Sequence, residues 1–137
     1  MRPPKKQGDV SFAYFLARGL ELEWTVSVPV GDCDRYDCII DRGTGLERVQ
    51  VKTGKLKDGV IVFSTSSSTY HVPDGCNTKH LRHSYRGQIE HFGVYCPQTR
   101  KCYLIGVNGV GEREGGLRVD SPKNERKNVR WAKDFEI

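Results

Sequence analysis

A chain of 137 residues has the size of a single domain built around one hydrophobic core. Its formal net charge of +5, from 22 basic and 17 acidic side chains, favours a polyanionic partner, although many proteins that never meet nucleic acid carry a similar excess. No apolar run approaches the roughly 20 residues that span a bilayer, and the start MRPPKKQGDV lacks the apolar core of a secretory signal, so we expect a cytoplasmic protein without membrane contact.

The chain begins with a basic segment over 1–7 (MRPPKKQ), which we expect to be a mobile tail. The apolar residues that follow recur at helical spacing, which predicts an amphipathic helix over 9–18 that ends at Gly19. The next apolar segment, 23–30, is predicted to be a strand that ends near Pro29.

A β-hairpin is predicted next. One apolar run covers 36–40, valines alternate with polar residues over 49–52, and the intervening segment DRGTG is rich in turn formers. Alternation places the two valines on one face of the second strand and Gln50 and Lys52 on the other.

Asp37, on the first strand of this hairpin, would stand beside Gln50 and Lys52 if the valines face the core. The carboxylate, the Gln50 amide oxygen and the Val51 carbonyl are the kind of oxygen ligands that a hard cation prefers. Lys52 would then orient an attacking water and offset the charge of a phosphate. Because the pattern is short, the alternative is that these side chains form only the solvated face of an ordinary sheet.

Three more strands are predicted in the middle of the chain. The first covers 60–63, and two others, over 89–95 and 101–107, are separated by the turn-forming segment PQT. Between them, residues 64–86 read as a polar connection that holds three of the four histidines.

The last part of the chain contains a glycine-rich bend over 109–116, a short strand over 117–119 and a basic segment. Within the basic segment, Trp131, Ala132 and Phe135 are available to pack. A helix followed by strands and a mixed ending indicates an α/β or α+β domain around one sheet.

The cysteines predict free, partly buried thiols, because their number is odd and their spacing matches no disulfide framework. They are Cys33, Cys38, Cys76, Cys96 and Cys102. This usage agrees with a reducing compartment. Cys76, His80 and His83 offer the alternative of a zinc site, but their spacing fits no common zinc pattern.

Two basic stretches contain candidate DNA contacts. Within 71–86, basic and aromatic side chains are mixed in a way that suits contact with phosphates and bases. The C-terminal stretch would follow a DNA backbone, which makes binding salt-dependent. The candidate DNA-binding residues are Lys79, His80, Arg82, His83, Tyr85, Arg86, Arg118, Lys127 and Arg130. Ordinary solvated loops can have the same composition.

The pattern Asp37-x12-Gln50-Val51-Lys52 resembles the PD-(D/E)XK nuclease superfamily, in the version with glutamine in place of the usual acid. The segments RYDCIID, RVQVKTG, YRGQIEHFGVYC, KCYLIGV and LRVDSPKN…VRWAKDFEI are similar to a small endonuclease family. That family includes group I intron homing endonucleases of this fold and uncharacterised prokaryotic relatives.

The resemblance runs over nearly the whole chain, so it implies one nuclease-like domain over 1–137. It implies a restriction-endonuclease-like α/β fold with a mixed central sheet flanked by helices. It also implies Mg2+-dependent cleavage of double-stranded DNA by an oligomer, with Mn2+ as a substitute. Asp37, Gln50 and Lys52 are then the catalytic residues, and Asp37, Gln50 and Val51 are the metal ligands.

Several positions of the resemblance differ or are open. Relatives tend to carry a glutamate in the first helix where this chain has Phe12, and Asp9, nearly a turn earlier, is a further candidate ligand. Ser66 and Tyr85 are accessory candidates on the resemblance alone. Glu90 also matches an acid of the family, and we expect it to cap a strand or to pair with a nearby arginine, Arg86.

Cutting both strands of a duplex needs two active sites that face opposite backbones, which a two-fold homodimer supplies. A single module also covers only a short stretch of DNA. We therefore expect at least a dimer and a pseudo-palindromic target. The alternatives are a junction resolvase, a non-catalytic DNA-binding module descended from a nuclease, and a protein-interaction domain whose basic charge is incidental.

Overall fold

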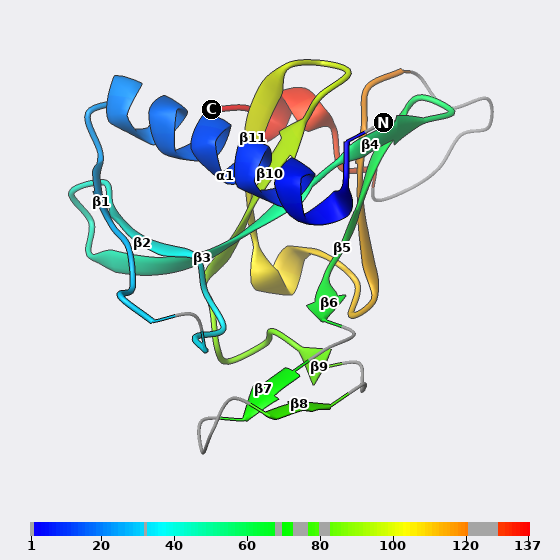
Figure 1. Cartoon of the computed structure of the whole chain (residues 1–137). Helices are drawn as coiled ribbons and strands as arrows, with labels where there is room; N and C mark the ends of the chain where they lie inside the picture. Colours follow the sequence, from blue (N-terminus) through cyan, green and yellow to red (C-terminus); the bar gives the residue numbers. More distant parts are fainter. Residues whose placement is uncertain (1, 32, 68–69, 73–76, 80–82, 121–128) are drawn as a thin grey trace.

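The computed structural model describes residues 2–31, 33–67, 70–72, 77–79, 83–120 and 129–137. In this part of the chain, helix α1 packs on one face of a five-stranded sheet, and a three-stranded sheet covers much of the other face (Figure 1). Two small ribbons extend from one end of these layers (Figure 1).

The central sheet is mixed, as predicted. Its order is β1-β2-β3-β10-β11, in which β3 and β10 run parallel and the other neighbours are antiparallel. The strands are β1 (Thr25–Ser27), β2 (Cys38–Asp41), β3 (Leu46–Thr53), β10 (His91–Cys96) and β11 (Lys101–Gly106). The hairpin of β2 and β3 and the hairpin of β10 and β11 confirm two predictions from the sequence.

Helix α1 spans Pro4–Glu21 and is longer than predicted at both ends. Residues 4–7 are helical, which corrects the expectation of a mobile tail over 1–7. Proline near the first helical position is already set for the helix, and the lysines that follow are good helix formers. Gly19 does not end the helix, because it is buried where the helix lies against Trp24.

The helix is held to the sheet by a cluster of buried side chains centred on Phe15. A Cβ atom at Gly93 would lie 2.5 Å from the Phe15 ring, so the glycine allows the helix to approach β10. Side chains alternate along the strands between the two faces. The cluster on the helix side contains Phe15, Cys38, Ile40, Val49, Tyr95, Cys102 and Leu104.

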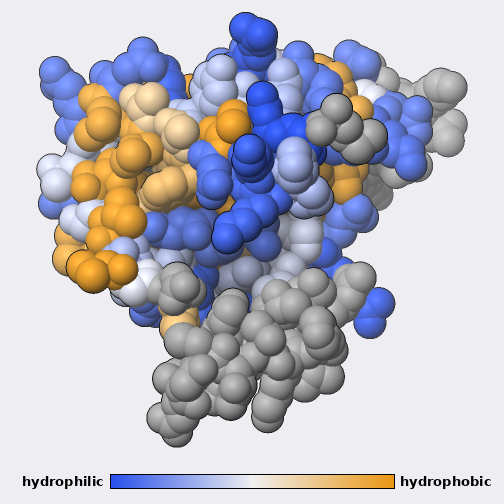
Figure 2. All heavy atoms as spheres, in the orientation of Figure 1, coloured by the Kyte–Doolittle hydropathy of each residue, from blue (hydrophilic) through white to orange (hydrophobic). Residues whose placement is uncertain are grey.

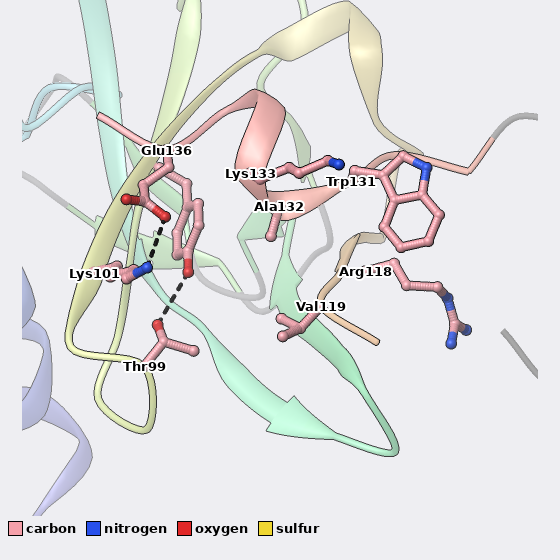
Figure 3. Close-up of a pocket in the computed structure, with 9 residues that line it drawn as sticks. Thr99, Lys101, Arg118, Val119, Trp131, Ala132, Lys133 and Glu136 are labelled. Atoms are coloured by element: carbon pink, nitrogen blue, oxygen red, sulfur yellow. Dashed lines mark hydrogen bonds and ion pairs between the residues drawn. The ribbon is translucent and has the colours of Figure 1, made fainter. Parts of the chain in front are cut away.

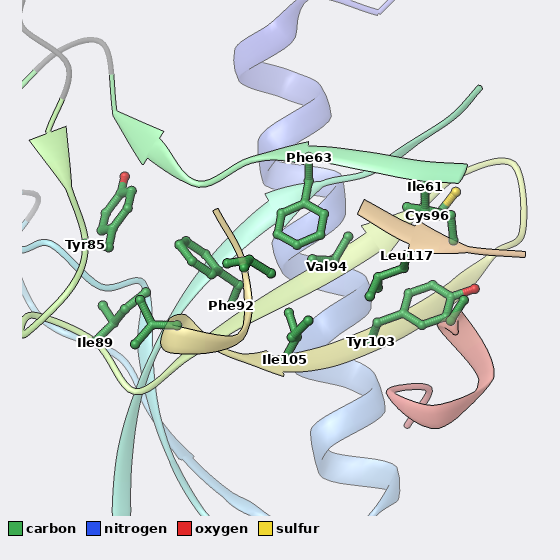
Figure 4. Close-up of a cluster of buried hydrophobic side chains, with 13 residues drawn as sticks. Ile61, Phe63, Tyr85, Ile89, Phe92, Val94, Cys96, Tyr103, Ile105 and Leu117 are labelled. Carbon is green, nitrogen blue, oxygen red and sulfur yellow. The ribbon is translucent and has the colours of Figure 1, made fainter. Parts of the chain in front are cut away.

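The opposite face of the central sheet is covered by strands. The second sheet has the order β12-β5-β4, formed by Glu114–Arg118, Val60–Ser64 and Lys55–Lys57. Figure 4 shows the buried cluster between the sheets, where Phe63 and Phe92 pack with their ring centroids 6.0 Å apart. Among the described residues α1 is the single α-helix, so the expected flanking helices are replaced on this face by a sheet.

The connection over 64–86 contains short strands that the sequence did not predict. Ribbon β6-β9 pairs Ser66–Ser67 with His83–Ser84, and ribbon β7-β8 pairs Tyr70–Val72 with Asn77–Lys79. Strands of two or three polar residues lack the apolar alternation on which the prediction depends.

The remaining boundaries differ from the predictions by a few residues. Strand β1 is shorter than 23–30, because Glu23 adopts a positive φ of 63° in the turn that follows α1. Strand β12 begins at Glu114, inside the predicted bend. Short 3-10 helices cover Val107–Gly109 and Ala132–Asp134.

Cys33 takes part in a disulfide bond, which corrects the expectation of free thiols at this position. Disulfides depend on proximity in the fold, which the number and spacing of cysteines do not reveal. Cys38, Cys96 and Cys102 are free and buried. None of the described helices is long and apolar enough to cross a membrane.

Candidate functional site

Asp37 is fixed at the end of the β2-β3 hairpin, one residue before β2. Its backbone N–H donates to the Val49 carbonyl at 2.9 Å, and its Oδ2 accepts the Val51 N–H at 2.8 Å. Burial raises the pKa of Asp37 above its ordinary value, against the smaller lowering effects of the Val51 hydrogen bond and the Lys52 charge. The carboxylate therefore sits where it would gain from a neighbouring positive charge.

A cavity of about 110 Å³ joins Asp37 to Gln50. Gln50 follows Val49 on β3, and Val49 is fully buried on the helix side, as the predicted alternation requires. The cavity is lined by Cys33, Asp34, Arg35, Asp37, Gln50, Ser67 and Tyr85. The arrangement of Asp37 and Gln50 in one small area is the one predicted from the hairpin pattern.

Lys52 reaches this area through Tyr85. The Lys52 Nζ lies 3.4 Å from the Tyr85 hydroxyl and 4.9 Å from the centre of the ring. Tyr85 is only 4% exposed and packs edge-on against Phe92, with 5.6 Å between ring centroids. A buried aromatic ring therefore holds the lysine whose charge acts on Asp37.

Phe12 of α1 lines a second cavity, of about 270 Å³, together with Asp37. Asp37 thus lies between a polar cavity and one that has an aromatic wall. Asp9 is exposed on α1 and lines neither cavity. Phe12 therefore lies on the side of Asp37 that faces the helix. Asp9 does not lie there.

A divalent cation beside Asp37 would have few ligands from the protein. Within the described residues, no three His, Cys, Asp or Glu side chains form a group that could hold a metal. A cation here would depend on the Asp37 carboxylate with the Gln50 amide oxygen and the Val51 carbonyl. Mg2+ takes one or two carboxylates and keeps several waters, so this small donor set fits it.

Cys38, next to Asp37, is buried on the helix side. Burial, and then the charge of Asp37, raise the pKa of the Cys38 thiol to about 12. The thiol therefore stays protonated near neutral pH and offers no nucleophile or metal ligand.

Glu90 pairs with Arg48 and not with Arg86, which corrects the expected partner. The Arg48 backbone N–H donates to Glu90 Oε1 at 2.8 Å, and the Arg48 Nε donates to the same oxygen at 3.0 Å. Hydrogen bonds from Arg48 hold the pKa of Glu90 below its ordinary value. Glu90 therefore ties β10 to β3, which is the structural role expected.

Of the two accessory candidates, one lines the cavity and the other does not. Tyr85 lines it, whereas Ser66, in β6, does not and is paired with Ser84 in the ribbon. Ser67 lines the cavity in its place. No pattern in the sequence points to Ser67, because it reaches the cavity through a contact between distant segments, and Arg35 is present only as the first residue of the RYDCIID segment.

The candidate DNA contacts of the first basic stretch are only partly described. Lys79 lies in β8 and His83 in β9, while His80 and Arg82 fall outside the described residues, as does Cys76. Arg86 is exposed, donates to the Val110 carbonyl at 3.1 Å and pairs with Glu112 at 3.4 Å. Tyr85 is buried and faces Lys52.

Arg118 and Arg130, of the second stretch, lie near the end of the chain, and Lys127 falls outside the described residues. The Arg118 N–H donates to the Arg130 carbonyl at 2.7 Å. Figure 3 shows Arg118 beside Trp131 at a cavity of about 240 Å³. Trp131 is half-buried at this cavity, with the Lys133 ammonium 5.9 Å from its ring.

Comparisons with known proteins identify the family and the fold. A family model described as PD-(D/E)XK endonuclease matches residues 2–137. Among solved structures, the fold is similar to that of a bacterial homing endonuclease, I-Ssp6803I, with a TM-score of 0.72 and 26% sequence identity over 98% of this chain and 89% of that chain. No curated protein matches the chain.

Proposed function

The chain belongs to the PD-(D/E)XK endonuclease family, and we propose that it hydrolyses phosphodiester bonds of double-stranded DNA with Mg2+, for which Mn2+ can substitute. The observation that carries this proposal is that Asp37 and Gln50 line one small cavity together with Tyr85, whose hydroxyl lies 3.4 Å from the Lys52 Nζ. We further propose that the protein acts in the cytoplasm.

The residues have separate roles in the proposed reaction. Asp37, Gln50 and the Val51 carbonyl hold the cation. When bound, Mg2+ polarises the phosphate and activates a water molecule. Lys52 holds the attacking water or a phosphate oxygen and offsets the charge that develops on the phosphate. Tyr85 restricts the position of the Lys52 ammonium.

Site-specific cleavage of the homing-endonuclease type is supported by the similarity to I-Ssp6803I, a homing endonuclease. The segment over 71–86 would read bases, and Arg118, Lys127 and Arg130 would contact phosphates. Ribbons β6-β9 and β7-β8 carry the first segment away from the sheets, where a DNA groove could receive it (Figure 1).

We propose that the protein acts as a homodimer. Strand β1 forms an edge of the central sheet, and the residues around it leave apolar side chains in contact with water. Leu20, Val28 and Val30 are exposed here, and Figure 2 shows apolar residues gathered on this side of the molecule. An edge strand with exposed apolar side chains favours pairing with another chain.

A cleavage assay on plasmid pools of random sequence, with Mg2+ or Mn2+, tests the activity. Lys52→Ala and Asp37→Ala should each reduce the rate by about 100-fold or more, because each removes a group that stabilises charge in the transition state. The control is Lys55→Ala, which removes an exposed lysine of β4 and should cleave like the wild type. Equal cleavage by all four proteins would reject the site.

The presence of Phe12 beside Asp37 favours one alternative, a DNA-binding module that has lost catalysis. That protein would bind DNA in a salt-sensitive manner and cleave nothing in either metal. Preferential cleavage of four-way junctions over linear duplex would instead identify a junction resolvase.

A further inference from the structure

Arg35, two residues before Asp37, contacts strand β6 and residues 84–88 with one side chain. Its Nη1 donates to Ser67 Oγ at 2.6 Å, its Nε to Gln88 Oε1 at 2.5 Å, and its Nη2 to the Ser84 carbonyl at 3.1 Å. The centre of its guanidinium also lies 3.9 Å from the centre of the Tyr85 ring. One side chain therefore contacts four residues that are 32 to 53 positions away.

These contacts require an arginine. The planar guanidinium presents several N–H groups in fixed directions and can stack on an aromatic ring at the same time. A lysine at this position would keep the charge but lose the fixed directions and the stacking. The contacts of Arg35 therefore depend on the shape of the guanidinium and not only on its positive charge.

Arg35 and Lys52 contact the same ring. The guanidinium of Arg35 lies over Tyr85, and the Lys52 Nζ lies 3.4 Å from the hydroxyl of that residue. Asp37 is held separately, by its hydrogen bonds to β3. A change at Arg35 would therefore act on the Lys52 ammonium through Tyr85 and leave the carboxylate in place.

We propose that Arg35 is a positioning residue that sets the place of the Lys52 ammonium relative to Asp37, because it holds Tyr85, which Lys52 contacts. This proposal rests on the proposed nuclease function only for its effect on the reaction rate. The contacts themselves make a second prediction, which concerns the chemical reactivity of Lys52 and holds whether or not the protein cleaves DNA.

The rate is tested with Arg35→Lys and Arg35→Ala, and with Arg42→Ala as control. Arg42 pairs with Glu47 at 2.8 Å on the far part of the hairpin, so its loss removes an arginine without disturbing the site. Both Arg35 variants should reduce single-turnover cleavage at saturating DNA by about 10- to 100-fold, because small displacements of reacting groups have effects of this size. An unchanged rate in Arg35→Lys would overturn the positioning role.

The salt dependence of DNA binding distinguishes positioning from a direct phosphate contact. A lost phosphate contact flattens the slope of log affinity against log salt by about 0.9. A positioning residue leaves the slope and the affinity unchanged, and this is the result that we expect for Arg35→Ala. A slope that falls by this amount would assign Arg35 to the DNA backbone instead.

The reactivity of Lys52 supplies the independent measurement. Acetic anhydride modifies accessible amines, and mass spectrometry reads each site. Arg35→Lys should raise the modification of Lys52 several-fold relative to Lys55 of the same molecule, because a lysine would not stack on the Tyr85 ring as the guanidinium does, and Tyr85 would hold the Lys52 ammonium less firmly. An unchanged ratio would overturn the proposal, even if the wild type cleaves DNA. A raised ratio in a protein that cleaves nothing would retain the proposal and reject the nuclease function. If Arg35→Ala fails to fold, Arg35→Lys decides both tests.

Discussion

Asp37→Asn should stabilise the folded protein when no cation is bound. Below the ordinary pKa of 3.8 the carboxyl is protonated in both the folded and the unfolded states, so it has no effect on stability. Burial raises the pKa of Asp37 in the folded state, so the unfolded state ionises first as the pH rises. The free energy of unfolding of the wild type therefore falls with rising pH until the pH exceeds the raised pKa. The amide carries no charge and still accepts the Val51 N–H, so the variant avoids this loss.

Mg2+ should stabilise the wild type and not the variant. A ligand at ten times its dissociation constant stabilises the protein that binds it by about 1.4 kcal/mol. For 137 residues the entropy of unfolding is about 0.29 kcal/mol/K, so the wild-type Tm should rise by about 5 °C. Asp37→Asn, which lacks the carboxylate ligand, should show almost no rise.

Thermal unfolding followed by circular dichroism between pH 3 and pH 8, with and without Mg2+, measures both effects. Asp58→Asn is the matched control, because Asp58 lies exposed in the β4-β5 turn at φ 52°, which asparagine tolerates. The control should follow the wild type in both series. An equal rise in Tm for wild type and Asp37→Asn would refute the assignment of Asp37 as a metal ligand.

Three further outcomes test other parts of the structure. Gly93→Ala should lower the free energy of unfolding by about 1–3 kcal/mol in urea titrations, since its Cβ would overlap the Phe15 ring, and a variant that is as stable as wild type would contradict this packing. Phe12→Glu should lower the dissociation constant of Mn2+, measured by calorimetry, by about tenfold, which is roughly 1.4 kcal/mol. An unchanged dissociation constant would place position 12 outside the site. Arg86→Ala should relax the sequence preference of the protein in a cleavage-site selection. Arg130→Ala should instead weaken binding to all sequences and flatten the salt dependence of binding. Identical effects of the two variants would contradict this division of roles.

The central hairpin and its site could be predicted because they depend on local patterns. Alternation along β3 fixes which face Gln50 and Lys52 share, and the turn before the strand brings Asp37 opposite them. These relations involve residues at most 15 apart in the sequence, so the pattern alone determines them.

Contacts between distant segments could not be predicted in this way. Ribbon β6-β9 pairs two polar strands of two residues each, and nothing in their composition separates them from a loop. The fastening of Arg35 to Ser67 and Gln88 exists only because that ribbon returns to the site. The start of α1 at Pro4 differs from the prediction for another reason, since a basic composition does not exclude a helix and proline suits a first helical turn.

Phe12 and Tyr85 together explain how the site departs from a fully acidic one. On the helix side of Asp37 the wall is an aromatic ring, which supplies no ligand. On the other side Tyr85 contacts Lys52, whose positive charge acts on the carboxylate. Both features favour a single cation bound by few protein oxygens, because a second cation would lack a carboxylate and would meet the Lys52 charge. The first helix therefore shapes the cavity, and the hairpin supplies its chemistry.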